Sequence, residues 1–343
     1  MNGIRLPSIV IAALAAATIS TIAHPVAAQS VEQFYKGKTV TVMIGHPPGG
    51  SYDLYARLAT DHLQRFIPGN PNVILQHKPG GGGTIAVTYF YDQAPRDGSM
   101  IGLFPETIGH TQVINPKVGK WKLQEMTYIG SLTSVNAAFV RRKDAVAKTI
   151  DEMKQKEMNV GCTGQTSQSY QTSAMLKNLA GLKLKIICGY QGSKEYVLAM
   201  ERGEIDAVSS AWNQWASGNA QHFASGDFVA VIQTGLKRHP DLANVPLAQD
   251  LVSDPERKKI FEFASAGSAI GRALMVPPGV PKDRIDALRA AFDKLVKDPQ
   301  FIADANKRRA ALDPTPGTEV QKAALAIISA PKDIVAKAAD AIK

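Results

Sequence analysis

The stretch TVTVMIGHPPGGSYDLYARLATDHL, residues 39–63, contains the pattern that decides the fold. Residues 39–45 are β-branched and apolar, and the turn-forming PPGG of residues 47–50 follows them, which is typical of a strand that ends in a tight turn. From Ser51 onward, Leu54, Leu58 and His62 or Leu63 recur at helical spacing. The stretch therefore predicts a strand, a glycine-rich turn and a helix in direct succession.

The same order returns along the chain. NVILQ (72–76) leads to four glycines (80–83), a helix from 84 to 90 and a strand MIGLF (100–104). Further strands are predicted at 128–132, 137–140, 159–162, 183–189, 205–209, 229–233 and 271–276, and further helices at 149–156, 169–180, 282–296, 299–311 and 318–341. This alternation indicates an α/β protein with a mostly parallel sheet. A chain of 343 residues is long enough for two domains.

The first 28 residues differ from the rest. Arg5 is the only charged residue before Glu32, residues 8–23 are apolar and small, and 25–28 (PVAA) carry the small residues that signal peptidases prefer. We predict a signal peptide, residues 1–28, cleaved after Ala28; an uncleaved anchor is the alternative. Export to the periplasm follows.

Two cysteines, Cys162 and Cys188, each end a short strand-like run. If the two runs are adjacent strands, a disulfide can form in an oxidising compartment. Otherwise both are small buried apolar residues.

The net charge is +9, or +8 without Arg5. Basic residues occur in short clusters, and no aromatic ladder or nucleic-acid module accompanies them, so nucleic acid is not the expected partner. A positive field does concentrate anionic solutes.

Four turns could hold such a solute: residues 47–51, 80–84, 163–167 and 191–193. Each precedes a predicted helix, and the first two are rich in glycine. A bend at the start of a helix leaves backbone N–H groups free for an anion, and in a parallel sheet the carboxyl ends of strands share one edge. The alternative is that each is only a tight turn.

Other kinds of site have weaker support. Residues 81–86 fit G-x-G-x-x-A, but a glycine run fits that pattern automatically, and no ribose-binding acid follows at the expected distance. No Gly-Lys-Ser/Thr follows the glycines, and the sequence has neither a G-x-S-x-G elbow nor metal-ligand spacing among its histidines. We expect no cofactor, no metal and no catalysis.

Three segments, residues 42–57 (VMIGHPPGGSYDLYAR), 78–86 (KPGGGGTIA) and 94–98 (APRDG), resemble in this order the extracytoplasmic solute-binding proteins of tripartite tricarboxylate transporters, the Bug or TctC-like family. The segments 190–193, 203–206, 244–246 and 277–282 extend the resemblance over nearly the whole mature chain.

The resemblance implies a two-lobe periplasmic binding protein fold of type II, a Venus flytrap with a cleft between lobes. It implies that backbone amides of the first two turns and ordered waters bind a carboxylate. Lobe I would comprise 29–131 and 236–343, and lobe II 132–235. Asp53 would orient waters, accept a hydrogen bond from the ligand, or cap the helix.

His46 and Tyr52 depart from the family pattern, as do the turn 164–167 and the segment 212–215. His46 and Trp212 would adjust selectivity, with charge from His46 when it is protonated, or they would only pack between the lobes. The predicted ligand-binding residues are His46, Pro48, Gly49, Gly50, Ser51, Tyr52, Asp53, Gly82, Gly83, Thr84, Gln165, Thr166, Ser167, Tyr190, Ser193 and Trp212.

The sequence thus predicts a monomeric, periplasmic binding protein that takes up a small carboxylate with high affinity and delivers it to membrane permease subunits of a secondary transporter. The alternatives are an exported hydrolase or a sensor component that uses the same cleft.

Overall fold

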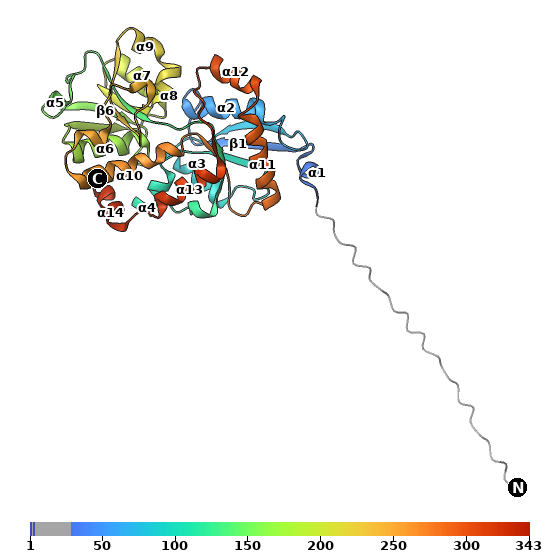
Figure 1. Cartoon of the computed structure of the whole chain (residues 1–343). Helices are drawn as coiled ribbons and strands as arrows, with labels where there is room; N and C mark the ends of the chain where they lie inside the picture. Colours follow the sequence, from blue (N-terminus) through green and yellow to red (C-terminus); the bar gives the residue numbers. More distant parts are fainter. Residues whose placement is uncertain (2, 4–28) are drawn as a thin grey trace.

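The computed structural model describes Met1, Gly3 and residues 29–343. The predicted signal peptide therefore lies almost wholly outside the described residues. Two mixed β-sheets, each with its own covering helices, lie side by side and form two lobes (Figure 1).

The first sheet has six strands and includes the predicted strand of the stretch 39–63. In spatial order, its strands are β11 (Thr315–Pro316), β4 (Thr127–Ser131), β10 (Ala273–Val276), β3 (Met100–Leu103), β1 (Thr39–Ile44) and β2 (Asn72–His77). β1 lies inside the sheet and four of its six residues are buried, whereas side chains of the edge strand β2 alternate between more and less exposed positions. A half-covered edge strand alternates in this way because successive side chains point to opposite faces.

The second sheet has five strands. In spatial order, they are β7 (Leu184–Cys188), β6 (Met158–Cys162), β8 (Ala207–Ala211), β5 (Ala137–Arg142) and β9 (Phe228–Thr234).

Both sheets are mixed, which corrects the expectation of a mostly parallel arrangement. β1 is parallel to β2 and β3, and β6 is parallel to β7 and β8, but β10 and β5 are antiparallel to both of their neighbours. The parallel pairs occur where a helix connects the strands. β4 and β5 are instead joined by a short crossing between the lobes. A long crossover is needed only where the two strands that it joins are parallel neighbours in one sheet.

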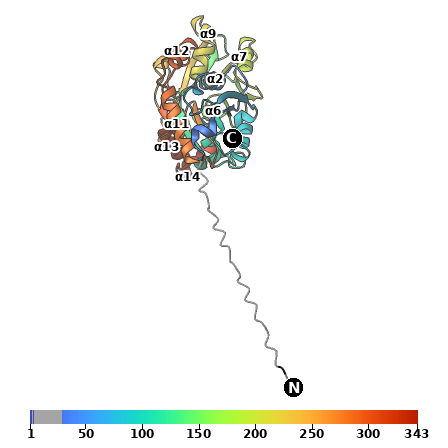
Figure 2. The same ribbon diagram turned by 90° about the vertical axis from the view of Figure 1, so that its right-hand side faces the viewer.

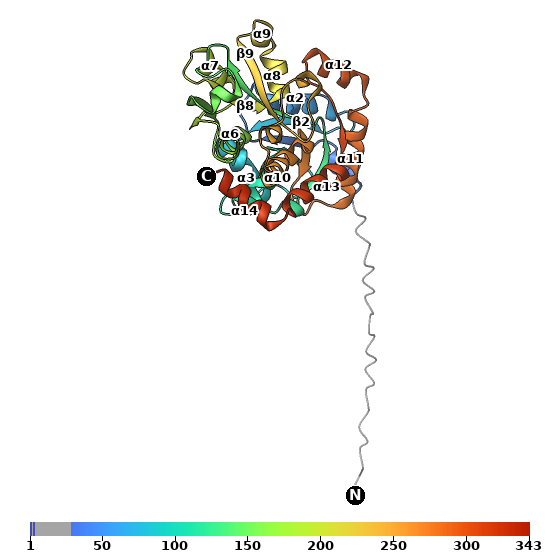
Figure 3. The same ribbon diagram turned by 60° about the vertical axis from the view of Figure 1, so that its left-hand side comes forward.

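The helices cover these sheets and fill the space between them. In chain order, they are α1 (Val31–Tyr35), α2 (Ser51–Leu63), α3 (Thr84–Asp92), α4 (Ile108–Ile114), α5 (Ile150–Met153), α6 (Gln168–Ala180), α7 (Ser193–Glu201), α8 (Trp212–Gly218), α9 (Ala220–Ala224), α10 (Pro255–Ser265), α11 (Lys282–Leu295), α12 (Pro299–Lys307), α13 (Gly317–Ile328) and α14 (Lys332–Ala341). α11 and α13 both pack on β4 and lie near each other (Figures 2 and 3).

The C-terminal helices differ from the prediction, and the helix expected over 299–311 ends at Lys307. The single helix expected over 318–341 is divided into α13 and α14, because Pro331 lacks the N–H that a continuous helix needs. α14 then lies against α6, where Asn178 donates a hydrogen bond to the Ala341 carbonyl at 2.9 Å (Figure 3). The end of the chain thus connects both lobes.

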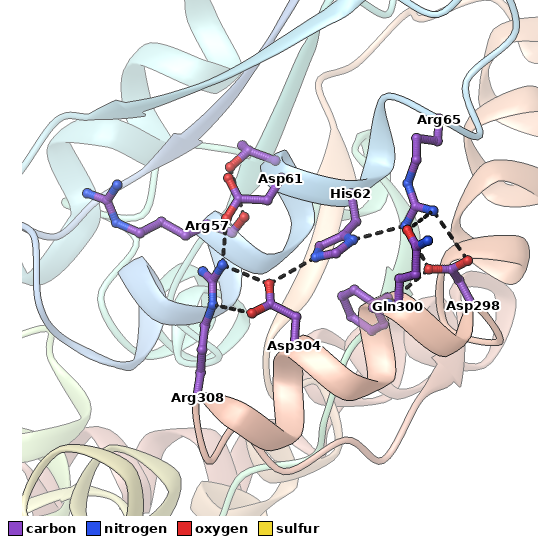
Figure 4. Close-up of polar contacts among 10 residues, drawn as sticks. Arg57, Asp61, His62, Arg65, Asp298, Gln300, Asp304 and Arg308 are labelled. Atoms are coloured by element: carbon purple, nitrogen blue, oxygen red, sulfur yellow. Dashed lines mark hydrogen bonds and ion pairs between the residues drawn. The ribbon is translucent and has the colours of Figure 1, made fainter.

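Helix α2, which begins at the first glycine turn, is fixed from behind by polar contacts with α12 (Figure 4). His62 Nε2 lies 2.9 Å from Asp304 Oδ2, and His62 Nδ1 lies 3.0 Å from Arg65 Nη2. Arg308 bonds both Asp304 and Asp61. Burial would raise the pKa of Asp304, but hydrogen bonds from His62 and Arg308 hold it below its usual value. These contacts anchor α2 and so position its first turn.

Candidate ligand-binding site

A cavity of about 360 Å³ lies between the lobes. His46, Pro48, Gly50 and Tyr52 line it from one lobe, and residues of the other lobe complete it. The lining from that second lobe is rich in hydroxyl and amide groups: Thr163, Ser167, Gln168, Ser169, Gln191, Ser193, Ser209, Ser210 and Gln214. This volume is suited to a small organic molecule.

Three helices begin at the cavity wall. Ser51 opens α2, Gln168 opens α6 and Ser193 opens α7, and all three residues line the cavity. The first N–H groups of an α-helix have no acceptor within the helix, and the helix dipole places partial positive charge there. One helix from the first lobe and two from the second therefore favour a negatively charged group in the same cavity.

The glycine turn at residues 47–51 is held in place by Asp53. Its carboxylate accepts hydrogen bonds from the Gly49 N–H at 2.9 Å, from Arg57 Nε at 3.0 Å and from His77 Nε2 at 2.7 Å. Burial would raise the pKa of Asp53, but these three bonds lower it. Asp53 is buried and does not line the cavity, so its place is beneath the turn.

The floor of the cavity contains a buried ion pair. Arg272, 1 % exposed, donates from Nη1 to Glu106 Oε2 at 2.9 Å and from Nε to Ser51 Oγ at 2.8 Å. Tyr52 donates to the same Glu106 oxygen at 2.7 Å. Burial opposes the positive charge of Arg272, but attraction to its neighbours, including Glu106, raises its pKa, so it remains charged.

His46 stacks on Tyr52 with ring centroids 4.2 Å apart, and the Arg272 guanidinium lies 4.1 Å from the centre of the same Tyr52 ring. Burial and repulsion by Arg272 lower the pKa of His46 to about 4. His46 is therefore neutral at neutral pH and does not supply the positive charge considered from the sequence. Its Nδ1 is enclosed and has no partner among the described residues.

The lobes are in contact across the cavity. Thr166 donates from Oγ1 to the Gly81 carbonyl at 2.7 Å, and Ser51 donates from Oγ to Asn213 Oδ1 at 3.1 Å. A Cβ on Gly82 would lie 3.1 Å from Ser167, so this glycine permits the close approach. The second and third predicted turns thus contact each other directly across the boundary between the lobes.

Cys162 and Cys188 are joined by a disulfide between the ends of β6 and β7, where they are direct partners in the parallel register. Thr163 follows the first cysteine and Gln191 lies three residues beyond the second, and both line the cavity. The bond therefore ties together the two turns that the second lobe contributes.

Eight of the predicted ligand-binding residues line the cavity: His46, Pro48, Gly50, Ser51, Tyr52, Gly82, Ser167 and Ser193. Gly49, Asp53, Gly83, Thr84, Gln165, Thr166 and Tyr190 do not line it and lie in or beside the same turns. Trp212 packs against Phe223 and donates to Asp241 at 2.9 Å, away from the cavity.

Glu106, Arg272 and Gln214 also line the cavity, although they are not among the predicted ligand-binding residues. Glu106 follows the end of β3, where the strand-end rule could have found it. Arg272 precedes an antiparallel strand, and nothing in its local sequence marks it.

Two further features are absent from residues 29–343. No three His, Cys, Asp or Glu side chains there are grouped to hold a metal ion. Within the same range, no helix combines the length and apolar character needed to cross a bilayer.

The two lobes and the cavity between them define a two-lobe periplasmic binding protein fold. BugD, a periplasmic binding protein, is similar in structure, with a TM-score of 0.70 at 19% identity over 89% of this chain and 98% of BugD. MatC from Rhodopseudomonas palustris, solved with malate, has a TM-score of 0.67 at 20% identity over 89% of this chain and 99% of MatC. An R. palustris protein solved with adipate has a TM-score of 0.68 at 17% identity over 88% of this chain and 97% of its own.

The family model of the tripartite tricarboxylate transporter family receptor, TctC, matches residues 56–327, and the chain belongs to this family. In sequence it is similar to a UPF0065 protein of Cupriavidus necator, with 24% identity over 84% of each chain. The resemblance recognised in the glycine turns is confirmed.

Proposed function

We propose that this protein binds a small carboxylate in the cavity between its lobes and delivers it to the membrane subunits of a tripartite tricarboxylate-type transporter. The convergence of three helix N-termini on one cavity between the lobes carries the proposal. Desolvated carboxylate oxygens that accept N–H groups at helix starts form short, charge-assisted hydrogen bonds.

The mode of binding is lobe closure. The carboxylate binds one lobe and bridges to the other, and hydrogen bonds such as Thr166 to Gly81 form as the cleft shuts. The lobes are residues 29–131 with 236–343, and 132–235. All strands of the six-stranded sheet fall in the first set and all strands of the five-stranded sheet in the second, which supports this division.

The protein acts in the periplasm as a monomer after cleavage of residues 1–28. The short apolar run at 8–23, the disulfide and membership of the receptor family support this location. Two relatives of the same fold were solved with malate and with adipate, which supports a carboxylate as the class of solute.

The test is a thermal-shift panel of mono-, di- and tricarboxylates with mass analysis of the recovered ligand. At about 1,000 times its Kd, a ligand stabilises the folded state by about 4 kcal/mol. We expect at least one acid to raise the Tm and to be recovered unchanged. An altered mass would identify an enzyme, and a panel with no shift would contradict the proposal.

A further inference from the structure

The glycine turn at residues 47–51 and the start of α7 face each other across the boundary between the lobes. A Cβ on Gly192 would lie 2.8 Å from Cγ of Pro47, and a Cβ on Gly50 would lie 2.9 Å from Oγ of Ser193. All four of these residues line the cavity. The N-termini of α2 and α7 are therefore close together at this side of the cavity.

Lys194, in the first turn of α7, extends its side chain from the second lobe to the first. A Cβ on Gly49 would overlap Cε of Lys194 and would lie 2.7 Å from its Nζ, so the ammonium group lies against this glycine. Pro48 and Gly50, the chain neighbours of Gly49, line the cavity, and so does Lys194. The ammonium group is thus at the edge of the cavity, where the two lobes meet.

Four charged side chains line the cavity together with the neutral His46: Glu106, Lys194, Glu195 and Arg272. Glu106 and Arg272 form the buried pair of the cavity floor. Glu195 accepts a hydrogen bond from the Gln191 N–H at 2.7 Å, which holds its carboxylate at the start of its own helix. Lys194 is exposed and makes no ion pair or hydrogen bond with any residue of the range 29–343, so its three donors are available to a solute.

The charges of Lys194 and Glu195 cancel in number but not in position. Adjacent residues of a helix do not face each other. Lys194 extends to Gly49 of the other lobe, whereas Glu195 folds back on Gln191 of its own lobe. A solute carboxylate that touches the turn at 47–51 therefore meets the ammonium group, and the N-termini of α2 and α7 add partial positive charge there.

We infer that Lys194 is a specificity-determining residue that recognises the negative charge of the solute. This inference rests on the proposed function. The Lys194 ammonium pairs with the solute's carboxylate where the turn at 47–51 meets α7. Because the ammonium belongs to the second lobe and the turn to the first, one carboxylate contacts both lobes. The pair lies at the edge of the cavity, so its strength depends on salt.

The experiment measures binding of acetate, succinate, glutarate, adipate and citrate by calorimetry at pH 7.5, in 20 mM and in 500 mM NaCl. Lys194→Met keeps an unbranched side chain that can cover Gly49 and removes only the charge. For the acid that binds the wild type most tightly, we expect its Kd to rise at least about fivefold in 20 mM NaCl and by a smaller factor in 500 mM NaCl. Lys194→Arg keeps the charge and should bind within about threefold of the wild type.

Two controls separate charge from shape. Lys185, on β7 of the same lobe, is also exposed and does not line the cavity, so Lys185→Met should bind within about twofold of the wild type. Glu195→Gln keeps an acceptor for the Gln191 N–H and removes a negative charge, so its Kd should be equal to or lower than that of the wild type. The Tm of Lys194→Met without ligand should stay within about 2 °C of wild type, because the side chain is exposed. Lys194→Gln is the second neutral variant if Lys194→Met does not fold.

The outcomes distinguish this inference from the proposed function. An unchanged Kd in the folded neutral variant of Lys194, or an equal loss in Lys194→Arg, would overturn the inference and leave carboxylate binding standing. A loss of the same size in Lys185→Met would do the same. Weaker binding in Glu195→Gln would also overturn it, because the effect would then come from the shape of the turn rather than from charge. If none of the five acids binds the wild-type protein, both proposals fail.

Discussion

Closure of the lobes can be tested at Gly192, which lies just before α7 in the second lobe. Its backbone is extended, with φ −176° and ψ −170°, so alanine is compatible with the local conformation. A Cβ at this position would lie 2.8 Å from Cγ of Pro47, on the other side of the cavity, and the proline ring cannot turn away. Gly192→Ala therefore obstructs contact between the lobes without straining either lobe.

The size of the effect follows from this overlap. Carbon atoms pack at about 3.5–4.0 Å, so the closed form must shift by roughly 0.7 Å or more, and such overpacking costs about 1–3 kcal/mol. In the proposed mechanism the ligand-free protein is open, so only the closed, ligand-bound form has this cost. We expect the Kd for the carboxylate found by the panel to rise about 5- to 150-fold, while the Tm without ligand stays within about 1 °C of wild type.

Calorimetry and a thermal melt measure these two quantities. In the double variant with Pro47→Ala, the ring carbon that meets the new methyl group is absent, so affinity should recover. Wild-type affinity in Gly192→Ala would refute the closure argument. So would an equal loss of affinity in the double variant, or a large loss of stability without ligand.

Three further predictions concern the groups around the cavity. The disulfide joins Cys162 and Cys188, which lie 26 residues apart, so replacement of both by alanine should lower the free energy of unfolding by about 3.5 kcal/mol. Urea titration measures this change, and an unchanged midpoint would contradict a structural role for the bond. The pKa of His46 falls from 6.5 when unfolded to about 4 when folded, so the unfolded state binds more protons and stability decreases as pH falls through this window. The Tm of His46→Phe should decrease less steeply between pH 7 and 4 than that of the wild type; parallel curves would be evidence against a buried neutral His46. Asp53→Asn removes charged hydrogen bonds, including the one to Gly49, and should cost about 1–3 kcal/mol of stability and weaken ligand binding, whereas unchanged values would show that the carboxylate does not hold the turn.

The local structure of the first lobe could be predicted from its sequence because the signals are local. The β-branched run at 39–44 forms β1, the glycines at 49 and 50 form the turn, and α2 starts at Ser51. The turn glycines are also where the chain needs unusual geometry: Gly49 has a φ of 95° and Gly83 of 97°.

Contacts between distant segments could not be predicted in the same way. Arg272 lies 166 residues from Glu106 and 221 from Ser51, and only the antiparallel placement of β10 brings them together. The packing of α14 on α6 likewise depends on tertiary contacts rather than on a local pattern. The direct contact of Thr166 with Gly81 joins residues of two lobes, and no single stretch of sequence encodes it.

The most direct test of carboxylate binding at the helix starts is a crystal structure of the complex with the acid that the thermal-shift panel identifies. We expect its carboxylate oxygens within hydrogen-bond distance of first-turn N–H groups of α2, α6 or α7, inside the cavity between the lobes. A carboxylate bound outside this cavity, or inside it with these N–H groups facing only solvent, would contradict the proposed site.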